Sequence, residues 1–485
     1  MNKLIHNTKL LYPIIITICF FYTGSAYMSQ MYLLMDYYSD VTVDLITSGI
    51  NYGLQAAGML LFMLGIKYIP NIFCRKNTFL ILIILGIPCM AAMLLIQNGL
   101  YMVLYGLLFH LLVGFYFGYY LTMLAAFVDQ SHIGLAYGIS YAIASVGTYL
   151  VSLIGEGQFL TSSTIVILYI LLGCVTAILV YFAEDIPVTP STQPASKTDP
   201  SVTSMSGKLS DTPEKSHNRN QSLDYMKEQS ELRSTILWLS IIILLMSIVS
   251  SIGSGLYLSL PGTENANFTL ARAFYAIGLI AAGIIIDKNR QLGGILTLAS
   301  LTYPLIATSI LYGGQNGTLA MCLSYLFIGF LAVYRVTVFA DLGKEKVHLL
   351  PITGFGLMIS RCVDVVITVL LEYISLSFML QLLITMVIYS VVLILFIFYL
   401  LRKKVKEEEP APSTDSLLAN FAERYALTAR ETEILSCIKD GMTDNEIAEK
   451  CFISKSTVRF HVSNLMKKTE CSSRVEIVRK FVKNK

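Results

Sequence analysis

Long runs of apolar residues follow one another along most of this 485-residue chain, and short polar stretches separate them. Twelve runs hold about 17 or more apolar-dominated residues, enough for a helix to cross a hydrocarbon core about 30 Å thick. One such run could be a buried helix of a soluble protein, but twelve in succession predict a polytopic membrane protein. The predicted spans are Leu10–Met28, Ile46–Ile69, Thr78–Ile96, Tyr101–Val128, Gly134–Ile154, Thr164–Phe182, Thr235–Leu258, Thr269–Ile286, Ile295–Tyr312, Leu319–Phe339, Ile352–Tyr373 and Met379–Leu401.

Composition supports this interpretation, because 55% of the residues are hydrophobic and only 14% are charged. Soluble globular domains are more polar. The first run lacks a small-residue cleavage site and is followed by further spans, so we expect a retained helix and not a signal peptide. The nine cysteines are scattered without a CxxC pair. We therefore expect no metal site, no disulfide framework and no cofactor.

Lys and Arg are distributed unevenly between the polar stretches. They occur near both ends of the membrane part and in the loops at Lys67–Lys76, Lys288–Arg290 and Lys344–Lys346, whereas the alternate loops carry none. The positive-inside rule then places both termini in the cytoplasm. We expect a multi-pass protein of the cytoplasmic membrane, in contact with membrane lipid.

A polar segment at residues 184–233 separates the first six spans from the last six. It is rich in Ser, Thr, Pro, Lys and Asp and nearly free of aliphatic residues, which favours a disordered cytoplasmic linker. The predicted organisation is a first six-helix membrane half at 1–183, this linker, a second six-helix half at 234–402, a short linker at 403–422 and a C-terminal domain at 423–485.

The stretch from Leu427 to Phe481 has a different pattern, with four short amphipathic segments. Two capping boxes begin helices, Thr428 with Glu431 and Thr443 with Glu446. Ser454 and Ser473 are candidate caps for two more helices. Residues 454–485 hold nine Lys and Arg against two Glu, which is the positive surplus that DNA phosphates attract. Two short helices joined by a turn, the second with a cationic outer face, predict a helix-turn-helix.

This stretch resembles the LuxR-type helix-turn-helix domain of bacterial transcription regulators. The resemblance rests on Leu427, Thr428, Arg430, Glu431, Glu433, Ile434, Leu435, Gly441, Asn445, Glu446, Ile447, Ala448, Ile453, Ser454, Thr457, Val458, His461, Lys467 and Lys468. Within it, the residues assigned to the helix-turn-helix motif are Thr443, Asn445, Glu446, Ile447, Ala448, Ile453, Ser454, Val458, His461 and Val462.

The resemblance implies that the third helix, Ser454 to Lys468, enters the major groove of double-stranded DNA. Arg459 would pair with guanine, Phe460 would touch a thymine methyl group, and Ser463 would lie one turn further on the same side. The expected phosphate contacts are Lys455, Ser456, Thr457, Lys467 and Lys468. Proteins of this kind act on paired half-sites, so we expect a homodimer on DNA. The alternative is that these cations only form a solvated face.

The six-plus-six arrangement resembles the major facilitator superfamily of transporters, whose two halves enclose a ligand site. The segment from Gly283 to Arg290 loosely matches that family's loop pattern GxxxD[RK]xxR, with its last arginine one residue early. The equivalent loop from Gly65 to Lys76 keeps the basic residues but lacks the aspartate. The predicted fold is all-α, with a polytopic bundle of twelve helices and a small C-terminal four-helix domain.

Charged side chains inside membrane spans usually face a cavity or a partner. The candidates for a ligand cavity are Arg272, Arg335, Arg361 and Asp364. Three arginines with one carboxylate favour a small anionic ligand, for example a carboxylate, held by Arg361 with help from Arg272. The alternative is that Arg361 and Asp364 neutralise each other on one helix. In the first half, His110 is either a ligand contact or a hydrogen-bonded core residue.

Two functions fit this pattern. The first is a membrane-embedded, one-component transcription regulator that senses a small-molecule ligand and binds DNA. The second is a transporter of the major facilitator type with a regulatory DNA-binding tail. The complete helix-turn-helix motif favours the first. The sequence shows no nucleophile–base pair, phosphate loop or metal cluster, so we expect no catalytic residues and no enzyme activity.

Overall fold

The computed structural model of the chain describes residues 8–154, 158–187, 214–258, 268–303, 306, 317–374, 376–408 and 414–483. These residues are almost entirely helical, and no strand occurs among them. They form two compact units, a larger one within residues 1–201 and 233–399 and a smaller one within 202–232 and 400–485. The predicted all-α class is confirmed.

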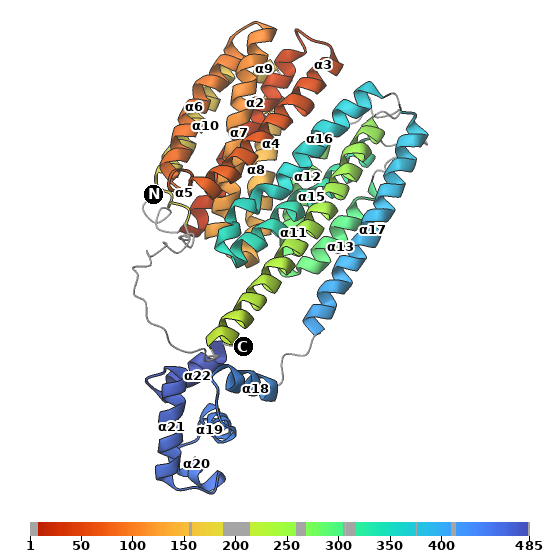
Figure 1. Cartoon of the computed structure of the whole chain (residues 1–485). Coiled ribbons are helices and arrows are strands. Elements are labelled where there is room, and N and C mark those ends of the chain that lie inside the picture. Colours follow the sequence, from red (N-terminus) through yellow and green to blue (C-terminus); the bar gives the residue numbers. More distant parts are fainter. Residues whose placement is uncertain are drawn as a thin grey trace, which may run out of the picture. The chain divides into compact units, whose positions relative to one another are not determined.

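Long apolar helices make up the larger unit, as two groups that follow one another in the chain (Figure 1). The first group is α2 (Thr8–Leu34), α3 (Asp40–Asp44), η1 (Leu45–Asn51), α4 (Tyr52–Tyr68), α5 (Pro70–Phe73), α6 (Lys76–Leu95), α7 (Gly99–Phe127), η2 (Gln130–His132), α8 (Ile133–Leu153), α9 (Gln158–Thr161) and α10 (Ser163–Tyr181). The second is α11 (Glu214–Leu258), α12 (Phe268–Lys288), α13 (Arg290–Ser300), α15 (Gly317–Glu345), η4 (Val347–Gly354), α16 (Phe355–Tyr373) and α17 (Phe378–Glu408). Of these helices, residues 214–232 of α11 and 400–408 of α17 belong to the smaller unit.

Eleven helical segments of the described residues are long and apolar enough to cross a membrane. They correspond to eleven of the twelve predicted spans, which confirms the polytopic prediction. The remaining predicted span, Ile295–Tyr312, lies largely outside the described residues, and α13 covers its beginning.

The second span begins earlier than predicted and is irregular. A π-helix, η1, joins α3 to α4 and precedes Tyr52 directly. π-Helical turns are rare and occur often at functional sites. Here η1 packs against α16 of the second half, so the irregular segment lies where the two halves meet.

Small residues allow the two halves to approach closely along α8 and α12. A Cβ atom added at Gly138 would lie 2.4 Å from the carbonyl oxygen of Leu279, which leaves no room for a larger residue. The α4–α16 and α7–η4 contacts also join the halves.

An ion-pair network connects the halves near the end of α12. Asp287 accepts hydrogen bonds from the backbone N–H groups of Gly134 and Leu135, at 2.9 and 2.7 Å, in the first turn of α8. Arg290 lies 2.7 Å from Asp287 Oδ1 and 2.8 Å from Asp341 Oδ2. A carboxylate at a helix N-terminus is favourable. At 1.5 Å per residue, Asp287 lies about 22 Å along α12 from Arg272, so this network is distant from the predicted cavity.

The predicted linker at 184–233 is helical in its last part. Instead of ending before the seventh span, it merges with that span, because α11 begins at Glu214. Residues 214–232 are rich in Glu, Lys, Gln, Arg and Leu, which are good helix formers, and the apolar span supplies a helix that can propagate into them. The part of this linker at 188–213 lies outside the described residues. The predicted linker at 403–422 likewise contains the end of α17 and most of α18 (Thr414–Arg424).

The smaller unit has a hydrophobic core of its own. Its helices are α18, α19 (Ala429–Lys439), α20 (Asp444–Lys450), α21 (Lys455–Thr469) and α22 (Arg474–Lys483). Ile434, Leu435, Ile447, Val458, Leu465 and Ile477 are fully buried in this core. Leu418 and Phe421 of α18 join them, so the four helices predicted from the sequence are present and α18 packs as a fifth.

Candidate ligand cavity and candidate nucleic-acid interface

Side-chain caps fix the ends of the helix-turn-helix helices. Both predicted capping boxes are present, Thr428 with Glu431 and Thr443 with Glu446. The Ser454 hydroxyl accepts a hydrogen bond from the backbone N–H of Thr457 at 3.1 Å, which fixes the start of α21. Gly441 follows α19 with a φ of +80°, a conformation that glycine adopts without strain.

The outer face of α21 presents most of the side chains assigned to DNA. Lys455, Ser456, Arg459, Phe460, Ser463, Lys467 and Lys468 are exposed. Thr457 is half-buried, and its hydroxyl lies 2.7 Å from the Ser454 hydroxyl, so it takes part in the cap. Among the motif residues, Ile447, Val458 and Val462 are core residues, while Ala448 and Ile453 pack against that core. His461 is half-buried and Asn445 is exposed.

Asp444, which sequence reasoning did not single out, connects three helices. Its Oδ2 lies 3.2 Å from Arg459 Nε, and its Oδ1 pairs with Arg474 Nη2 at the start of α22. The side chain assigned to guanine is therefore ion-paired within the domain while remaining 68% exposed. No local pattern pointed to this carboxylate, because its partners lie 15 and 30 residues away.

Lys468 has an internal partner as well. Its ammonium lies 2.6 Å from Glu431 Oε2 and donates to the carbonyl oxygen of Ala426 at 2.9 Å. Burial alone would raise the pKa of Glu431. The hydrogen bonds from Lys468 and from the N–H and hydroxyl of Thr428 outweigh burial, so the pKa of Glu431 lies below its ordinary value. Lys468 thereby ties α21 to the start of α19.

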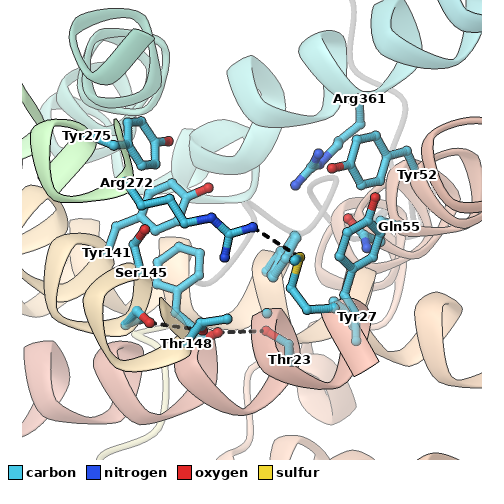
Figure 2. A pocket seen from close by; sticks show the side chains of 16 residues that line it. Thr23, Tyr27, Tyr52, Gln55, Tyr141, Ser145, Thr148, Arg272, Tyr275 and Arg361 are labelled. Atoms are coloured by element: carbon cyan, nitrogen blue, oxygen red, sulfur yellow. Dashed lines mark hydrogen bonds between the residues drawn. The ribbon is translucent and has the colours of Figure 1, made fainter. Parts of the chain in front are cut away.

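A cavity of about 210 Å³ lies between the two halves of the larger unit, and it brings two of the predicted cavity residues together. Arg272 of α12 and Arg361 of α16 both line it (Figure 2). Aromatic side chains from both halves complete its walls, among them Tyr27, Tyr52 and Tyr275. Arg272 Nη2 lies 3.6 Å from the thioether sulfur of Met28, which is only a weak acceptor.

The guanidinium of Arg361 is stacked and weakly paired. Its Cζ lies 3.7 Å from the centre of the Tyr52 ring, a cation–π distance. Its Nη1 is 3.9 Å from Asp364 Oδ2, which is too long for a hydrogen bond. The buried Nε finds no hydrogen-bond partner among the described residues. Arg361 and Asp364 therefore form a loose ion pair without a direct hydrogen bond, so the pairing that the sequence left open is present but weak.

Arg335 and Asp364 line a second cavity of about 550 Å³, which also reaches Arg361 and Tyr52. The four predicted cavity residues are thus divided between two neighbouring cavities, with Arg361 on the wall of both. Asp44 and Glu372 also line the larger cavity, so it contains charges of both signs.

Sequence reasoning missed a set of buried amide side chains beside the smaller cavity. Gln30, Asn51 and Gln55 are at most 3% exposed, and they surround His110, which is completely buried. His110 is hydrogen-bonded to Gln30 and Gln55, at 2.9 and 3.0 Å, so it is a hydrogen-bonded core residue and does not line either cavity described here. Uncharged amides inside a span give only a weak sequence signal, which is why they escaped notice.

These features define a polytopic helical membrane protein that ends in a helix-turn-helix domain. Residues 14–348 match the Major Facilitator Superfamily, and residues 425–481 match the luxR family of bacterial regulatory proteins. The first match covers well over half of the chain, so the chain belongs to the Major Facilitator Superfamily and carries a LuxR-type domain at its C-terminal end. Both resemblances seen in the sequence are confirmed.

Individual proteins resemble separate parts of the chain. The CsgBAC operon transcriptional regulatory protein of Escherichia coli K12 is 44% identical over 59 residues, which are 12% of this chain and 27% of the relative. The transcriptional regulatory protein LiaR of Bacillus subtilis is 43% identical over 57 residues, again 12% and 27%. The chain thus spans about a quarter of the length of these relatives.

The membrane part resembles a solved transporter. A crystal structure of the E. coli fucose:proton symporter FucP superimposes with a TM-score of 0.52, covering 81% of this chain and 98% of that chain at 13% identity. At this identity the likeness concerns the fold alone.

Proposed function

We propose that the protein is a membrane-embedded, one-component transcription regulator. Its LuxR-type domain binds double-stranded DNA, and its transporter-like unit senses a small anionic ligand. The observation that carries this proposal is the presence, in one chain, of an exposed cationic α21 and of a membrane unit whose inner cavity contains two arginines.

The DNA contact is proposed on the outer face of α21. Arg459 and Phe460 are exposed there, at 68% for the arginine side chain and 62% for the phenylalanine, so both can reach base edges, Arg459 by exchanging its contact with Asp444. Lys455 and Lys467 flank them and contact phosphates. Lys468 holds α19 and α21 together, as its pairing with Glu431 indicates, and contributes to DNA binding through that support.

A homodimer on DNA is proposed through α22. Val475 on this helix is 70% exposed, whereas Val478 packs against the core of its own domain. Val475 is therefore the apolar side chain that a second copy would cover. Two copies held in one membrane would raise the effective concentration of the domains without any new contact.

The ligand is proposed to be an anion because the positive charge of the smaller cavity is only loosely compensated. Arg272 and Arg361 line it, none of the described lining residues is acidic, and the nearest carboxylate oxygen to Arg361, on Asp364, is 3.9 Å away. A buried charge with a poor partner is costly, so a carboxylate bound between two guanidinium groups would stabilise the cavity. The ligand shifts the protein only as far as its affinities for two conformations differ.

The orientation follows from the positive-inside rule. Both termini and the LuxR-type domain face the cytoplasm, where DNA is, and the membrane is the cytoplasmic membrane. The Asp287 network then lies on the cytoplasmic side, where it holds the two halves together.

A promoter reporter tests the proposal once the DNA sites of the protein have been mapped in cells. A panel of small carboxylates should contain an inducer for the wild-type chain. Arg361→Ala should abolish the response at unchanged protein level, and Arg361→Lys should retain part of it. A fragment of residues 414–485 should still bind the mapped sites but ignore the inducer. An inducer response from this fragment would remove the membrane unit from sensing.

A transporter with a regulatory DNA-binding tail is the second candidate, and membership of the Major Facilitator Superfamily favours it. Uptake of the labelled inducer into vesicles discriminates between the two functions. Accumulation above that in vesicles carrying Arg361→Ala would support transport. Binding without accumulation would support a sensor.

A further inference from the structure

A series of hydrogen bonds connects α2, η1, α4 and α7 beside the smaller cavity. Asn51 Nδ2 donates to Gln30 Oε1 at 3.0 Å, and His110 Nε2 lies 2.9 Å from the same oxygen. Gln55 Nε2 lies 3.0 Å from His110 Nδ1. With the amides placed as they are, the Gln55 nitrogen donates to His110 Nδ1 and the Gln30 oxygen accepts from His110 Nε2, because an amide nitrogen only donates and an amide oxygen only accepts. The ring is therefore neutral, and its tautomer is set.

These hydrogen bonds determine how the side chain of Gln55 faces the cavity. Its amide nitrogen is used by His110, so rotating the amide would break that bond. Its Oε1 is buried and has no hydrogen-bond partner among the described residues. Gln55 itself is only 3% exposed and lines the cavity together with Arg272 and Arg361. Figure 2 shows Gln55 beside Tyr27 and Tyr52 at the cavity wall. Gln55 therefore lines the cavity beside two cationic donors, and its buried Oε1 has no hydrogen-bond partner among the described residues.

We propose that the ligand is a small anion that also carries a hydroxyl or amino group, and that Gln55 selects for this group. The anionic end binds Arg361 and Arg272, and the hydroxyl or amino group donates to Gln55 Oε1. This inference rests on the proposed function, in which the cavity takes an anion. A site with a buried polar group strongly rejects an analogue that leaves this group unpaired, because the cost of burying the group is then not offset by a hydrogen bond.

Matched pairs of small anions test this inference on the purified full chain in detergent micelles. The probes are acetate and glycolate, propionate and lactate, and, because the walls are aromatic, benzoate and 4-hydroxybenzoate. Affinities are measured by calorimetry. In at least one pair, the member with the hydroxyl group should bind roughly 10-fold or more tightly than its partner.

Two variants locate the effect. Gln55→Met keeps the side-chain length but removes the acceptor, so it should bind both members of the pair with the weaker affinity. Arg361→Ala should weaken both members and leave their ratio in place. Melting temperature and gel filtration check that each variant is folded, and if Gln55→Met does not fold, Gln55→Leu, which also lacks the acceptor, takes its place.

The outcomes separate this inference from the proposed function. Equal affinities within every pair, or a preference that persists in Gln55→Met, would overturn the role of Gln55 and leave the anion site standing. If no anion bound the wild-type chain, the anion site would fall, and the assignment of Gln55 with it.

Discussion

Arg459 in the LuxR-type domain and Arg361 in the membrane unit place the same guanidinium group in opposite settings. The side chain of Arg459 is 68% exposed, and its Nε lies 3.2 Å from a carboxylate oxygen of Asp444. The side chain of Arg361 is 16% exposed, and its nearest carboxylate oxygen, on Asp364, is 3.9 Å away. One arginine is solvated and closely paired, and the other is buried and loosely paired.

This difference in exposure and pairing distinguishes how the two arginines would bind, Arg459 to DNA and Arg361 to a small anion. Water screens the Arg459–Asp444 pair, so it contributes at most about 1 kcal/mol and exchanges readily for a contact to DNA. Arg361 lies where charges are poorly screened and its pairing with Asp364 is loose, so a ligand anion there supplies the close partner that Asp364 does not. Replacing the buried Arg361 should therefore cost more binding free energy for its ligand than replacing the exposed Arg459 costs for DNA.

The largest effect is expected for Arg361→Ala. Because truncating one side of a buried charge pair costs about 2–5 kcal/mol, the Kd of the bound anion should rise at least ~30-fold. Titration calorimetry of the purified full chain measures this change. Arg361→Lys, which keeps the charge but loses the fork of donors, should show a smaller loss. An unchanged Kd in the alanine variant would remove Arg361 from the site.

Arg459→Ala should have a more moderate effect, and on discrimination between DNA sequences. The loss of a paired guanine contact should reduce discrimination by about 1–3 kcal/mol. The matched control is Lys467→Ala on the same helix, which should weaken all sequences alike and lower the salt dependence of binding. Fluorescence anisotropy with mapped and scrambled duplexes measures both. Equal losses on both duplexes for Arg459→Ala would assign this arginine to phosphate.

Asp444→Asn should have a smaller effect of opposite sign. It removes a negative charge beside the DNA-binding face and frees Arg459, so every duplex should bind more tightly, by up to about 1 kcal/mol. The same anisotropy assay detects this gain. Weaker binding would mean that Asp444 orients Arg459 for reading and does not compete with DNA.

The smallest expected effect is the pH dependence of the domain's stability that comes from the ion pair of Glu431 with Lys468. The pKa of Glu431 is below its ordinary value of 4.5 in the folded domain, so the pair stabilises the domain fully above about pH 4.5. This stability is lost as the pH falls through the lowered pKa. Thermal unfolding of residues 414–485 from about pH 7 to about pH 3 should show it. Glu431→Gln should flatten this dependence, and Glu449→Gln, at an exposed position of α20, should not. Equal pH curves for the wild type and Glu431→Gln would contradict the pairing.

The two regions also differ in how far the sequence predicts them. The caps at Thr428, Thr443 and Ser454 and the end of α19 at Gly441 involve residues within a few positions of one another. Such local signals are visible in a sequence, and these predictions are confirmed. Asp444 was missed because its importance depends on contacts between three helices.

The cavity depends on contacts that a linear pattern does not contain. Arg272 and Arg361 were predicted from the sequence because they are charged residues inside apolar spans, where charges are rare. That the two line one cavity while Arg335 lines another follows from how α12, α15 and α16 pack. Gln55 and its partners carry no charge, and their importance appears only when His110 and Gln30 are brought together.

One measurement tests the central claim most directly, that occupation of the membrane cavity changes DNA binding. The full chain is reconstituted in lipid nanodiscs, and its affinity for a mapped DNA duplex is measured with and without a saturating anion from the calorimetric panel. We predict that the anion changes the Kd for DNA several-fold in the wild type and leaves it unchanged in Arg361→Ala. Unchanged DNA affinity in the wild type, with the anion shown to be bound, would contradict the account.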